Sequence, residues 1–444
     1  MLTVEILAEL SPGRRQAILA RSVDDLKPAM EVTRQIFDRL KADPEKELLR
    51  EYSQFKPNLA LKDFKVAEKE LAMARKGLTR ELNEALLRAK ENIERFHLSQ
   101  LEKPTYLTEI APGLLAGRVT RPLSKVGVYI PGGRAAYPSS ALMNVVPAKV
   151  AGVKTIVAVT PPGPGFKAWP IILAALELAG ATEIYKLGGA WAVGCLAYGL
   201  GGVPKVDKIV GPGSSWVTAA KMAVFGDVDI DQPAGPSEGF IIADGTAKPD
   251  FLAWDFISQL EHDPQASAVL VSADRVLAEK VAALVKKLLP SLDRAEIINQ
   301  SLANAAILVA KSLPEAFDFA NEYAPEHLEL ALDDAISHLG SIQNAGSIFL
   351  GHHSPIPAGD YATGPNHVLP TGGSARAFSG LSTDSFLKKM TFQKLTPEAL
   401  ADLAPTVTAL ARAEGLPAHA KTIEARVTPP TPSGAAPPDK KPKP

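Results

Sequence analysis

The sequence contains a single cysteine among 444 residues, Cys195. One cysteine excludes an intramolecular disulfide and a cysteine-based zinc cluster. Its apolar surroundings, VGCLAYG, indicate a buried structural thiol rather than a nucleophile. Long apolar runs are also missing, since none reaches the roughly 18 residues that a membrane span needs. The first thirty residues hold no basic stretch followed by an apolar one. We therefore expect a cytoplasmic protein with no membrane partner.

Net charge is nearly absent as well. The chain has 48 basic and 49 acidic residues, a formal charge of −1, which argues against a nucleic-acid partner bound through bulk charge. A G-x-G-x-x-G motif between a strand and a helix is also missing, so a dinucleotide would not bind by the standard fingerprint. What remains is a composition ordinary for a soluble enzyme, with 46% hydrophobic and 22% charged residues. Its length predicts two or more structural domains.

Strand-like and helix-like segments alternate from Val126 onward. The short β-rich runs are VGVYIP, TIVAVTPP, EIYKLGG and KIVGPG, and helical patterns such as AWPIILAALELAG lie between them. This alternation is typical of a parallel, doubly wound α/β layer. Each run ends in a Gly/Pro turn, and such turns gather at the carboxyl ends of the strands, where open α/β sheets bind ligands.

The alternation resumes after Pro233, with FIIAD, SAVLVSAD, AAILVA and SIFLG as predicted strands. We expect an α/β fold with two doubly wound, incomplete Rossmann-like domains, one inserted in the other, and small helical N- and C-terminal segments. In this prediction the helices before residue 125 complete the larger layer. The predicted parts are a helical segment 1–24, a main α/β domain 25–125 plus 234–380, an inserted nucleotide-binding domain 126–233, a helical segment 381–427 and a disordered, proline-rich tail 428–444.

Three clusters of polar residues stand out as candidates for chemistry. Gln259 and His262 lie three positions apart in DFLAWDFISQLEHDP, which we predict to be a short helix with both side chains on one face. Glu326 and His327 are adjacent just past a predicted helix. The third cluster, Gly359-Asp360-Tyr361 with Asn366-His367, lies in a long polar loop of a length that is usually functional or disordered. Glu414 and His419 form a possible fourth. Gln259, His262, Asp360 and His419 would give a nitrogen-and-oxygen ligand set that suits zinc, although spacing does not show that they converge.

Long blocks of the sequence resemble the histidinol dehydrogenase family. They include VGVYIPGGRAAYPSSALMNVVPAKVAGV, PAGPSE, ISQLEHDP, NEYAPEHLEL and GDYATGPNHVLPTGGSAR, and only about the last twenty residues lie outside the resemblance. The resemblance implies a four-electron oxidation of L-histidinol to L-histidine through the aldehyde with two NAD, the last step of histidine biosynthesis. It also implies one zinc ion per subunit and a homodimer in which the C-terminal segment reaches the partner's site.

The residue roles follow from the same resemblance. The implied zinc ligands are Gln259, His262, Asp360 and His419, and the implied acid/base pair is Glu326 and His327. Contacts to the substrate are implied for these residues together with Ser140, Ser237, His367 and Glu414.

The implied NAD contacts depart from the family pattern. Tyr129 is retained, but Trp191 stands where the family usually has Gln in G-G-A-Q, and Ser214 where it has Asn in G-P-G-N. Ser214 can still donate a hydrogen bond, whereas an indole offers only a donor and cannot replace an amide acceptor. Trp191 would either stack on a ring of the nucleotide, block the crevice, or reflect a packing change around an unchanged binding mode.

Two other functions remain open from the residues alone. One is a paralogue that oxidises another small polar alcohol with the same zinc and Glu-His apparatus. The other is a zinc-dependent binding protein whose nucleotide crevice has degenerated, although an intact Glu326-His327 pair argues against it.

Overall fold

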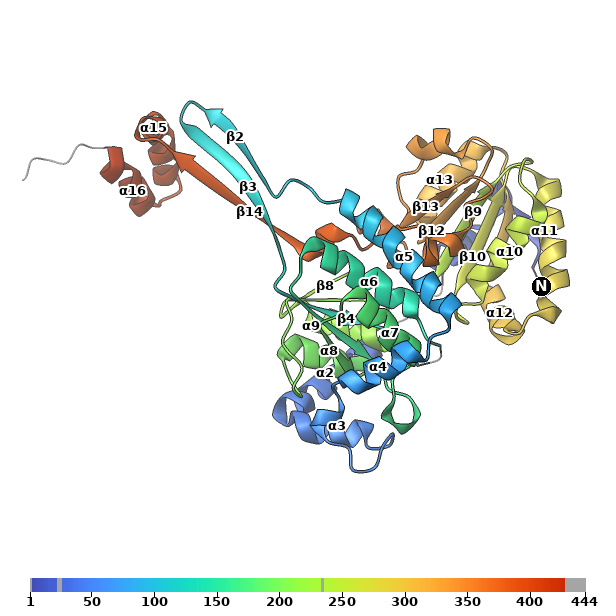
Figure 1. Ribbon diagram of the computed structural model, residues 1–444. Coiled ribbons are helices and arrows are strands. Elements are labelled where there is room, and N and C mark those ends of the chain that lie inside the picture. The colour runs from blue at the N-terminus through green and yellow to red at the C-terminus, as the bar shows by residue number, and fades with distance from the viewer. Residues whose placement is uncertain (1, 22–25, 134, 233–234, 428–444) are drawn as a thin grey trace, which may run out of the picture. The chain divides into compact units, whose positions relative to one another are not determined.

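The computed structural model describes all residues except 1, 22–25, 134, 233–234 and 428–444. The chain forms two compact units (Figure 1). The larger consists of Met1–Leu101 and Pro122–Leu387, and the smaller of Glu102–Arg121 and Lys388–Pro444. The tail predicted to be disordered lies outside the described residues. Within the described part, no helix is long and apolar enough to cross a membrane.

A six-stranded parallel sheet of the larger unit has the strand order β1-β11-β10-β9-β12-β13. Its strands are β1 (Val4–Ile6), β9 (Glu238–Ala243), β10 (Ser267–Ser272), β11 (Ala306–Val309), β12 (His327–Ala331) and β13 (Ser347–Leu350). Strands β9, β10 and β12 are buried along their whole length, as expected where helices cover both faces of a parallel sheet. One face packs on α10 (Pro249–Leu260), α11 (Arg275–Leu288) and α12 (Ala295–Ser301). The other packs on α1 (Pro12–Ala20) and α13 (Leu313–Tyr323).

A second, five-stranded parallel sheet of the same unit has the order β6-β5-β4-β7-β8. Its strands are β4 (Lys125–Tyr129), β5 (Thr155–Thr160), β6 (Glu183–Lys186), β7 (Lys208–Val210) and β8 (Asp229–Ile230). One face carries α4 (Glu68–Lys76), α5 (Arg80–Ser99), α6 (Pro138–Ala151) and α7 (Pro170–Ala179). The other carries α2 (Lys27–Ala42), α3 (Pro44–Tyr52), α8 (Gly189–Tyr198) and α9 (Ser215–Val224). Buried Cys195 belongs to this second core, as predicted, and burial raises the pKa of its thiol to about 12.

The two helix-covered parallel sheets confirm the predicted fold class. The packing of the early helices differs from expectation, because α2 to α5 lie on the five-stranded sheet and not on the larger one. Their apolar stripes predict which face is buried but not which sheet covers it. The N-terminal segment also contains a strand, β1, whose three residues are too few to show alternation. The domain limits remain a prediction.

The smaller unit contains a three-stranded sheet of order β14-β3-β2 and two helices. Its elements are β2 (Thr105–Ala111), β3 (Leu114–Pro122), β14 (Leu387–Leu395), α15 (Pro397–Ala413) and α16 (Pro417–Val427). Strands β2 and β3 are antiparallel. The segment 381–427 was expected to be helical, whereas it contains the nine-residue strand β14. Nearly every residue of β14 is exposed, so the strand lacks the buried, apolar alternation by which sequence reveals a strand.

Candidate active site

Most of the predicted catalytic and ligand residues of the larger unit lie near the amino ends of β9 and β12. His327 is the first residue of β12, and it is paired in register with Gly239 of β9. Asp360 comes from the short helix α14 (Ile356–Tyr361), where Gly359 lets the backbone approach Phe349 of β13. A Cβ atom at Gly359 would lie 2.4 Å from the Phe349 ring. Local packing therefore fixes the position of Asp360 relative to β12 and β13.

His327 is buried, and its ring is held in one orientation. Its Nδ1 lies 3.0 Å from the carbonyl oxygen of Glu238, and a carbonyl only accepts, so Nδ1 carries the hydrogen. Nε2 then faces Asp360, with Oδ1 3.5 Å away. Desolvation lowers the pKa of His327, but the charges of Glu326 and Asp360 outweigh it and raise that pKa to about 9. The imidazole is thus oriented for proton transfer at Nε2.

Glu326 is buried beside the imidazole. Its Oε2 accepts a hydrogen bond of 2.8 Å from the backbone nitrogen of Glu238 and lies 3.5 Å from His327 Nδ1. Desolvation raises the pKa of Glu326 to about 8, and the charge of His327 opposes that shift. Such shifts are frequent at functional sites because burial and charge are arranged there to tune proton transfer.

Gln259 and His262 flank the same region from α10. The helix ends at Leu260, so His262 lies in the turn beyond it and not on the helix as predicted. Gln259 is 1% exposed, and both atoms of its side-chain amide lack a hydrogen-bond partner among the described residues. Buried polar atoms without partners are rare in proteins and call for a ligand or water. Desolvation lowers the pKa of His262 and nearby Asp360 opposes the shift, although the residue as a whole is exposed.

His367 and Ser140 extend the cluster. His367 Nδ1 donates to the carbonyl oxygen of Asp360 over 2.8 Å, which leaves Nε2 as an acceptor 3.5 Å from the hydroxyl oxygen of Ser140 in α6. Burial lowers the pKa of His367. A pocket of about 240 Å³ is lined by His327, Asp360, His367 and the strand β13. The larger unit therefore brings together the predicted residues Ser140, Gln259, His262, Glu326, His327, Asp360 and His367.

The remaining predicted residues are placed differently. Ser237 is half-buried just before β9, and its carbonyl oxygen accepts a hydrogen bond from the backbone nitrogen of Ser267. Glu414 and His419 belong to the smaller unit, where both are exposed. Among the described residues, no three His, Cys, Asp or Glu side chains form a group suited to a metal. Of the predicted ligands, only His262 and Asp360 are of these types in the larger unit, so the ligand roles remain predictions.

The predicted nucleotide contacts lie around the five-stranded sheet. The Tyr129 hydroxyl at the end of β4 accepts a hydrogen bond of 3.2 Å from the backbone nitrogen of Gly189. The indole nitrogen of Trp191 donates to the carboxylate of buried Glu47 over 3.1 Å, so the one donor of Trp191 is used within the protein. Ser214 is exposed at the start of α9. The role of all three in NAD binding remains a prediction.

Glu238 is the residue that the sequence reasoning missed. It lies within the quoted PAGPSE block, next to Ser237, and its backbone contacts both Glu326 and His327. The block itself pointed to this position. What it did not show is that a backbone amide and carbonyl, rather than a side chain, make the contacts.

A second pair of acids lies nearby, with Glu329 of β12 buried and Asp255 of α10 half-buried. Desolvation raises the pKa of Asp255 to about 6, and it raises the pKa of Glu329 well above its usual range. Because the folded protein holds a proton on Asp255 more tightly than the unfolded chain, the unfolding free energy falls as pH rises from about 4 through 6. Asp255→Asn is expected to remove this loss, which makes the variant more stable than wild type by about 2 kcal/mol at pH 7.5.

Urea unfolding at pH 5 and pH 7.5 checks this prediction. The advantage of Asp255→Asn over the wild type should shrink at pH 5. An Asp255→Asn advantage equal at both pH values would contradict it.

Comparisons with known proteins agree with the sequence resemblance. The family model described as histidinol dehydrogenase matches residues 19–427. Histidinol dehydrogenase from Methanothermobacter thermautotrophicus is 49% identical over 380 residues, covering 85% of this chain and 89% of that protein. The enzyme of the same name from Methanosarcina mazei is 46% identical and covers 95% of this chain and 96% of its own. The crystal structure of histidinol dehydrogenase from Elizabethkingia anophelis superposes with a TM-score of 0.90 at 37% identity, covering 96% of this chain and 98% of that one. Since these matches span nearly its whole length, the chain belongs to the histidinol dehydrogenase family and is an NAD-dependent oxidoreductase.

Proposed function

We propose that the chain oxidises L-histidinol to L-histidine through the aldehyde, with two NAD and one zinc ion per subunit, as the last step of histidine biosynthesis. One observation carries the chemistry: His327 is buried next to Glu326, with Nδ1 bound to a carbonyl and Nε2 in the pocket beside Asp360. An imidazole fixed with Nε2 in the pocket can abstract the alcohol proton once Nε2 is deprotonated, a form that becomes more abundant as the pH rises toward the His327 pKa of about 9.

The residues of the larger unit fit a zinc ion. The partnerless amide of Gln259 offers an oxygen, while His262 and Asp360 offer a nitrogen and a carboxylate. We propose these three as ligands and His419 as the fourth, supplied with Glu414 by the partner subunit of a homodimer. When bound, the ion supplies positive charge that anchors the amino and imidazole nitrogens of the substrate and offsets the charge of Asp360 beside His327.

Proton transfer falls to the chain's own residues. His327 Nε2 takes the proton of the alcohol in the first oxidation, while NAD supplies the acceptor for the hydride. The aldehyde then adds water, and Glu326 in its ionised form removes a proton from that water. A second hydride and proton leave the hydrated aldehyde to give the acid, so two NADH form for each L-histidinol. Ser140, Ser237 and His367 are proposed to contact the substrate, and Tyr129, Trp191 and Ser214 the nucleotide.

An assay of the purified full chain with zinc, NAD and L-histidinol, followed at the NADH absorbance, tests this function. The expected result is two NADH per L-histidinol, loss of turnover with a chelator, and its recovery on adding zinc. NAD binding without turnover of L-histidinol would favour the paralogue that oxidises another small polar alcohol. Zinc binding without NAD binding would favour the binding protein with a degenerate nucleotide site. Activity that a chelator does not reduce would overturn the zinc proposal.

Gly239 is expected to be essential for the position of Gln259. A Cβ atom at Gly239 would lie 2.3 Å from Cγ of Gln259, which is too close for any real contact, and Gln259 is fully enclosed. Gly239→Ala should therefore displace the amide and lower zinc affinity by about 10- to 100-fold, with a loss of about 1–3 kcal/mol in unfolding free energy. Competition with a zinc chelator and urea unfolding measure the two effects.

Gly340→Ala is the matched control, because a Cβ atom at Gly340 would meet nothing within 4 Å. This variant should keep the zinc affinity of the wild type. Wild-type zinc affinity in Gly239→Ala would show that Gln259 is not a ligand.

A further inference from the structure

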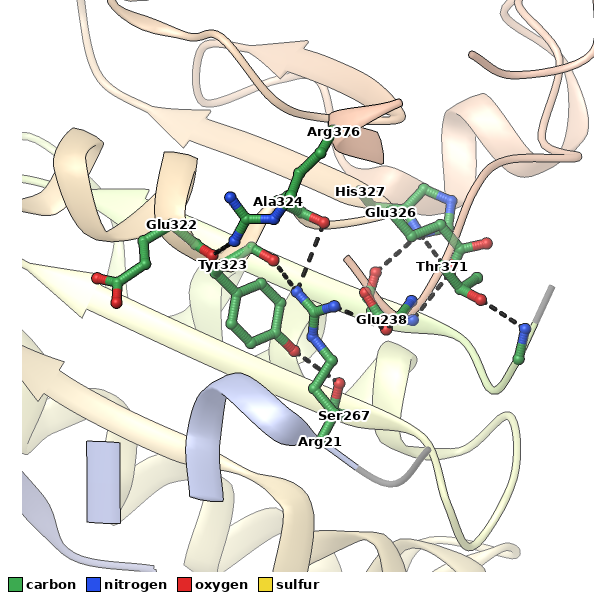
Figure 2. A network of polar contacts seen from close by, with 12 residues as sticks. Arg21, Glu238, Ser267, Glu322, Tyr323, Ala324, Glu326, His327, Thr371 and Arg376 are labelled. Atoms are coloured by element: carbon green, nitrogen blue, oxygen red, sulfur yellow. Dashed lines mark hydrogen bonds and ion pairs between the residues drawn. The ribbon is translucent and has the colours of Figure 1, made fainter. Parts of the chain in front are cut away.

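The side chain of Arg21 is buried although it comes from the N-terminal segment, just after α1. Its side chain is 4% exposed. Figure 2 shows its guanidinium between the end of α13 and the start of β9, within reach of groups from both. An arginine buried in this way needs several acceptors, because its five N–H groups form a fixed fork.

The end of α13 fixes this guanidinium in place. It lies over the ring of Tyr323, 3.6 Å from the ring centre, and Nη2 donates to the carbonyl oxygen of the same residue. A second carbonyl, that of Ala324, lies 3.5 Å away. Ala324 ends the helix in a left-handed conformation, with φ of 51°. A cation at the C-terminus of a helix is favourable because the last carbonyls have no partner within the helix. The residues that follow are Pro325, Glu326 and His327.

The other side of the guanidinium faces Glu238. Nη1 of Arg21 lies 3.4 Å from Oε1 of Glu238, which also accepts a hydrogen bond of 2.6 Å from the backbone nitrogen of Gly372. Glu238 is buried, and desolvation raises its pKa, while the charge of Arg21 gives the largest opposing effect. Arg21 therefore stabilises the ionised form of a buried carboxylate.

The backbone of Glu238 contacts both members of the proposed acid/base pair. Its nitrogen donates to Oε2 of Glu326 over 2.8 Å, and its carbonyl oxygen accepts from Nδ1 of His327 over 3.0 Å (Figure 2). A shift of this one residue would move the carboxylate and turn the imidazole together. The side chain of Glu238 is thus the point at which the N-terminal segment, β9 and the loop at Gly372 meet.

We propose that Arg21 is a positioning residue for the reaction, which holds the Glu326–His327 pair in its catalytic arrangement through Glu238. The inference rests on the proposed function, since it presumes the roles of Glu326 and His327. Misplacement of a catalytic group by about 1 Å lowers rates by about 100-fold. Arg21 contacts neither the pocket lining nor the predicted nucleotide residues in the described contacts.

Steady-state kinetics of Arg21→Met in the full chain test the proposal. We expect kcat to fall by about 10- to 100-fold, with KM for L-histidinol and for NAD changed by no more than about twofold. Arg21→Lys keeps the positive charge but loses the planar guanidinium with its five N–H donors. Its kcat should lie between those of Arg21→Met and the wild type. Arg15→Met is the matched control from the same segment, because Arg15 pairs with exposed Glu322 and should leave kcat unchanged.

A double-mutant cycle with Glu238→Gln tests the route. If Arg21 acts through Glu238, the double variant should lose about as much kcat as the more impaired single variant. If the fold-loss of kcat in the double variant equals the product of the two single losses, Arg21 does not act through Glu238. A wild-type kcat in Arg21→Met would overturn the proposal. If Arg21→Met does not fold, a wild-type kcat in Arg21→Lys would overturn it instead. More than about a tenth of wild-type turnover in His327→Asn would instead overturn the role of His327 that the proposal presumes, so this variant separates a failure of that role from a failure of the proposal for Arg21.

Discussion

Replacement of His327 by asparagine is expected to lower kcat by about 10³-fold, within the range found for a positioned general base. Asparagine keeps an N–H that can donate to the carbonyl oxygen of Glu238, so the local structure should persist. What it removes is Nε2, the one ring nitrogen that faces Asp360 and the pocket. The loss should therefore appear in kcat far more than in KM for L-histidinol. NADH formation in the steady state measures both constants.

The control for this variant is His353→Asn, since His353 is exposed and lies near the ring of Phe251. It should retain wild-type kcat and zinc content. If His327→Asn binds zinc normally and still turns over at more than about a tenth of the wild-type rate, His327 is not the base in the way proposed here.

The sequence predicted the fold class because its strands are buried on both faces and separated by apolar helices. Strands β9 and β10 contain the apolar runs FIIA and AVLV, and such runs need no partner information to be identified. The sequence does not show which sheet a helix packs on. The stripe of Ile36, Phe37 and Leu40 in α2 indicates burial, but only the structure shows that it packs on the five-stranded sheet.

The site, like the fold, could be predicted only in part from the sequence. Residue types singled out Glu326, His327 and Asp360 as candidates, and the family resemblance implied their roles. The structure brings His327 within 3.5 Å of both carboxylates. Arg21 and Glu238 were not foreseen, because Arg21 reaches the site with its side chain from a distant segment and Glu238 contacts the Glu326–His327 pair through its backbone. Trp191 shows a third limit: its indole bonds to Glu47, about which the motif G-G-A-W carries no information.

Loss of a buried ion pair next to the G-P-G-S turn is expected to lower the unfolding free energy by a large amount. Lys221 of α9 is 1% exposed, and it contacts Asp231, which follows β8. Together they hold Gly211: Lys221 donates to its carbonyl oxygen over 2.9 Å, and Asp231 accepts from its nitrogen over 2.7 Å. Gly211 has φ of 117°, and a Cβ atom there would lie 2.2 Å from the carbonyl oxygen of Tyr129. The ion pair thus fixes a turn that no other residue type fits.

Lys221→Met should lower the unfolding free energy by about 3–5 kcal/mol, because it leaves the carboxylate of Asp231 buried without its cation. KM for NAD should also rise, since the turn precedes Ser214, a proposed nucleotide contact. Urea unfolding and steady-state kinetics measure the two effects, and Asp231→Asn, which removes the other charge, supplies a second variant. The control is Asp229→Asn, because the Asp229 side chain, which pairs with Lys208, is 55% exposed. Loss of this partly exposed pair should cost about 1 kcal/mol or less. An equally small loss in Lys221→Met would mean that water or a neighbouring group replaces the cation, and that the turn does not depend on the pair.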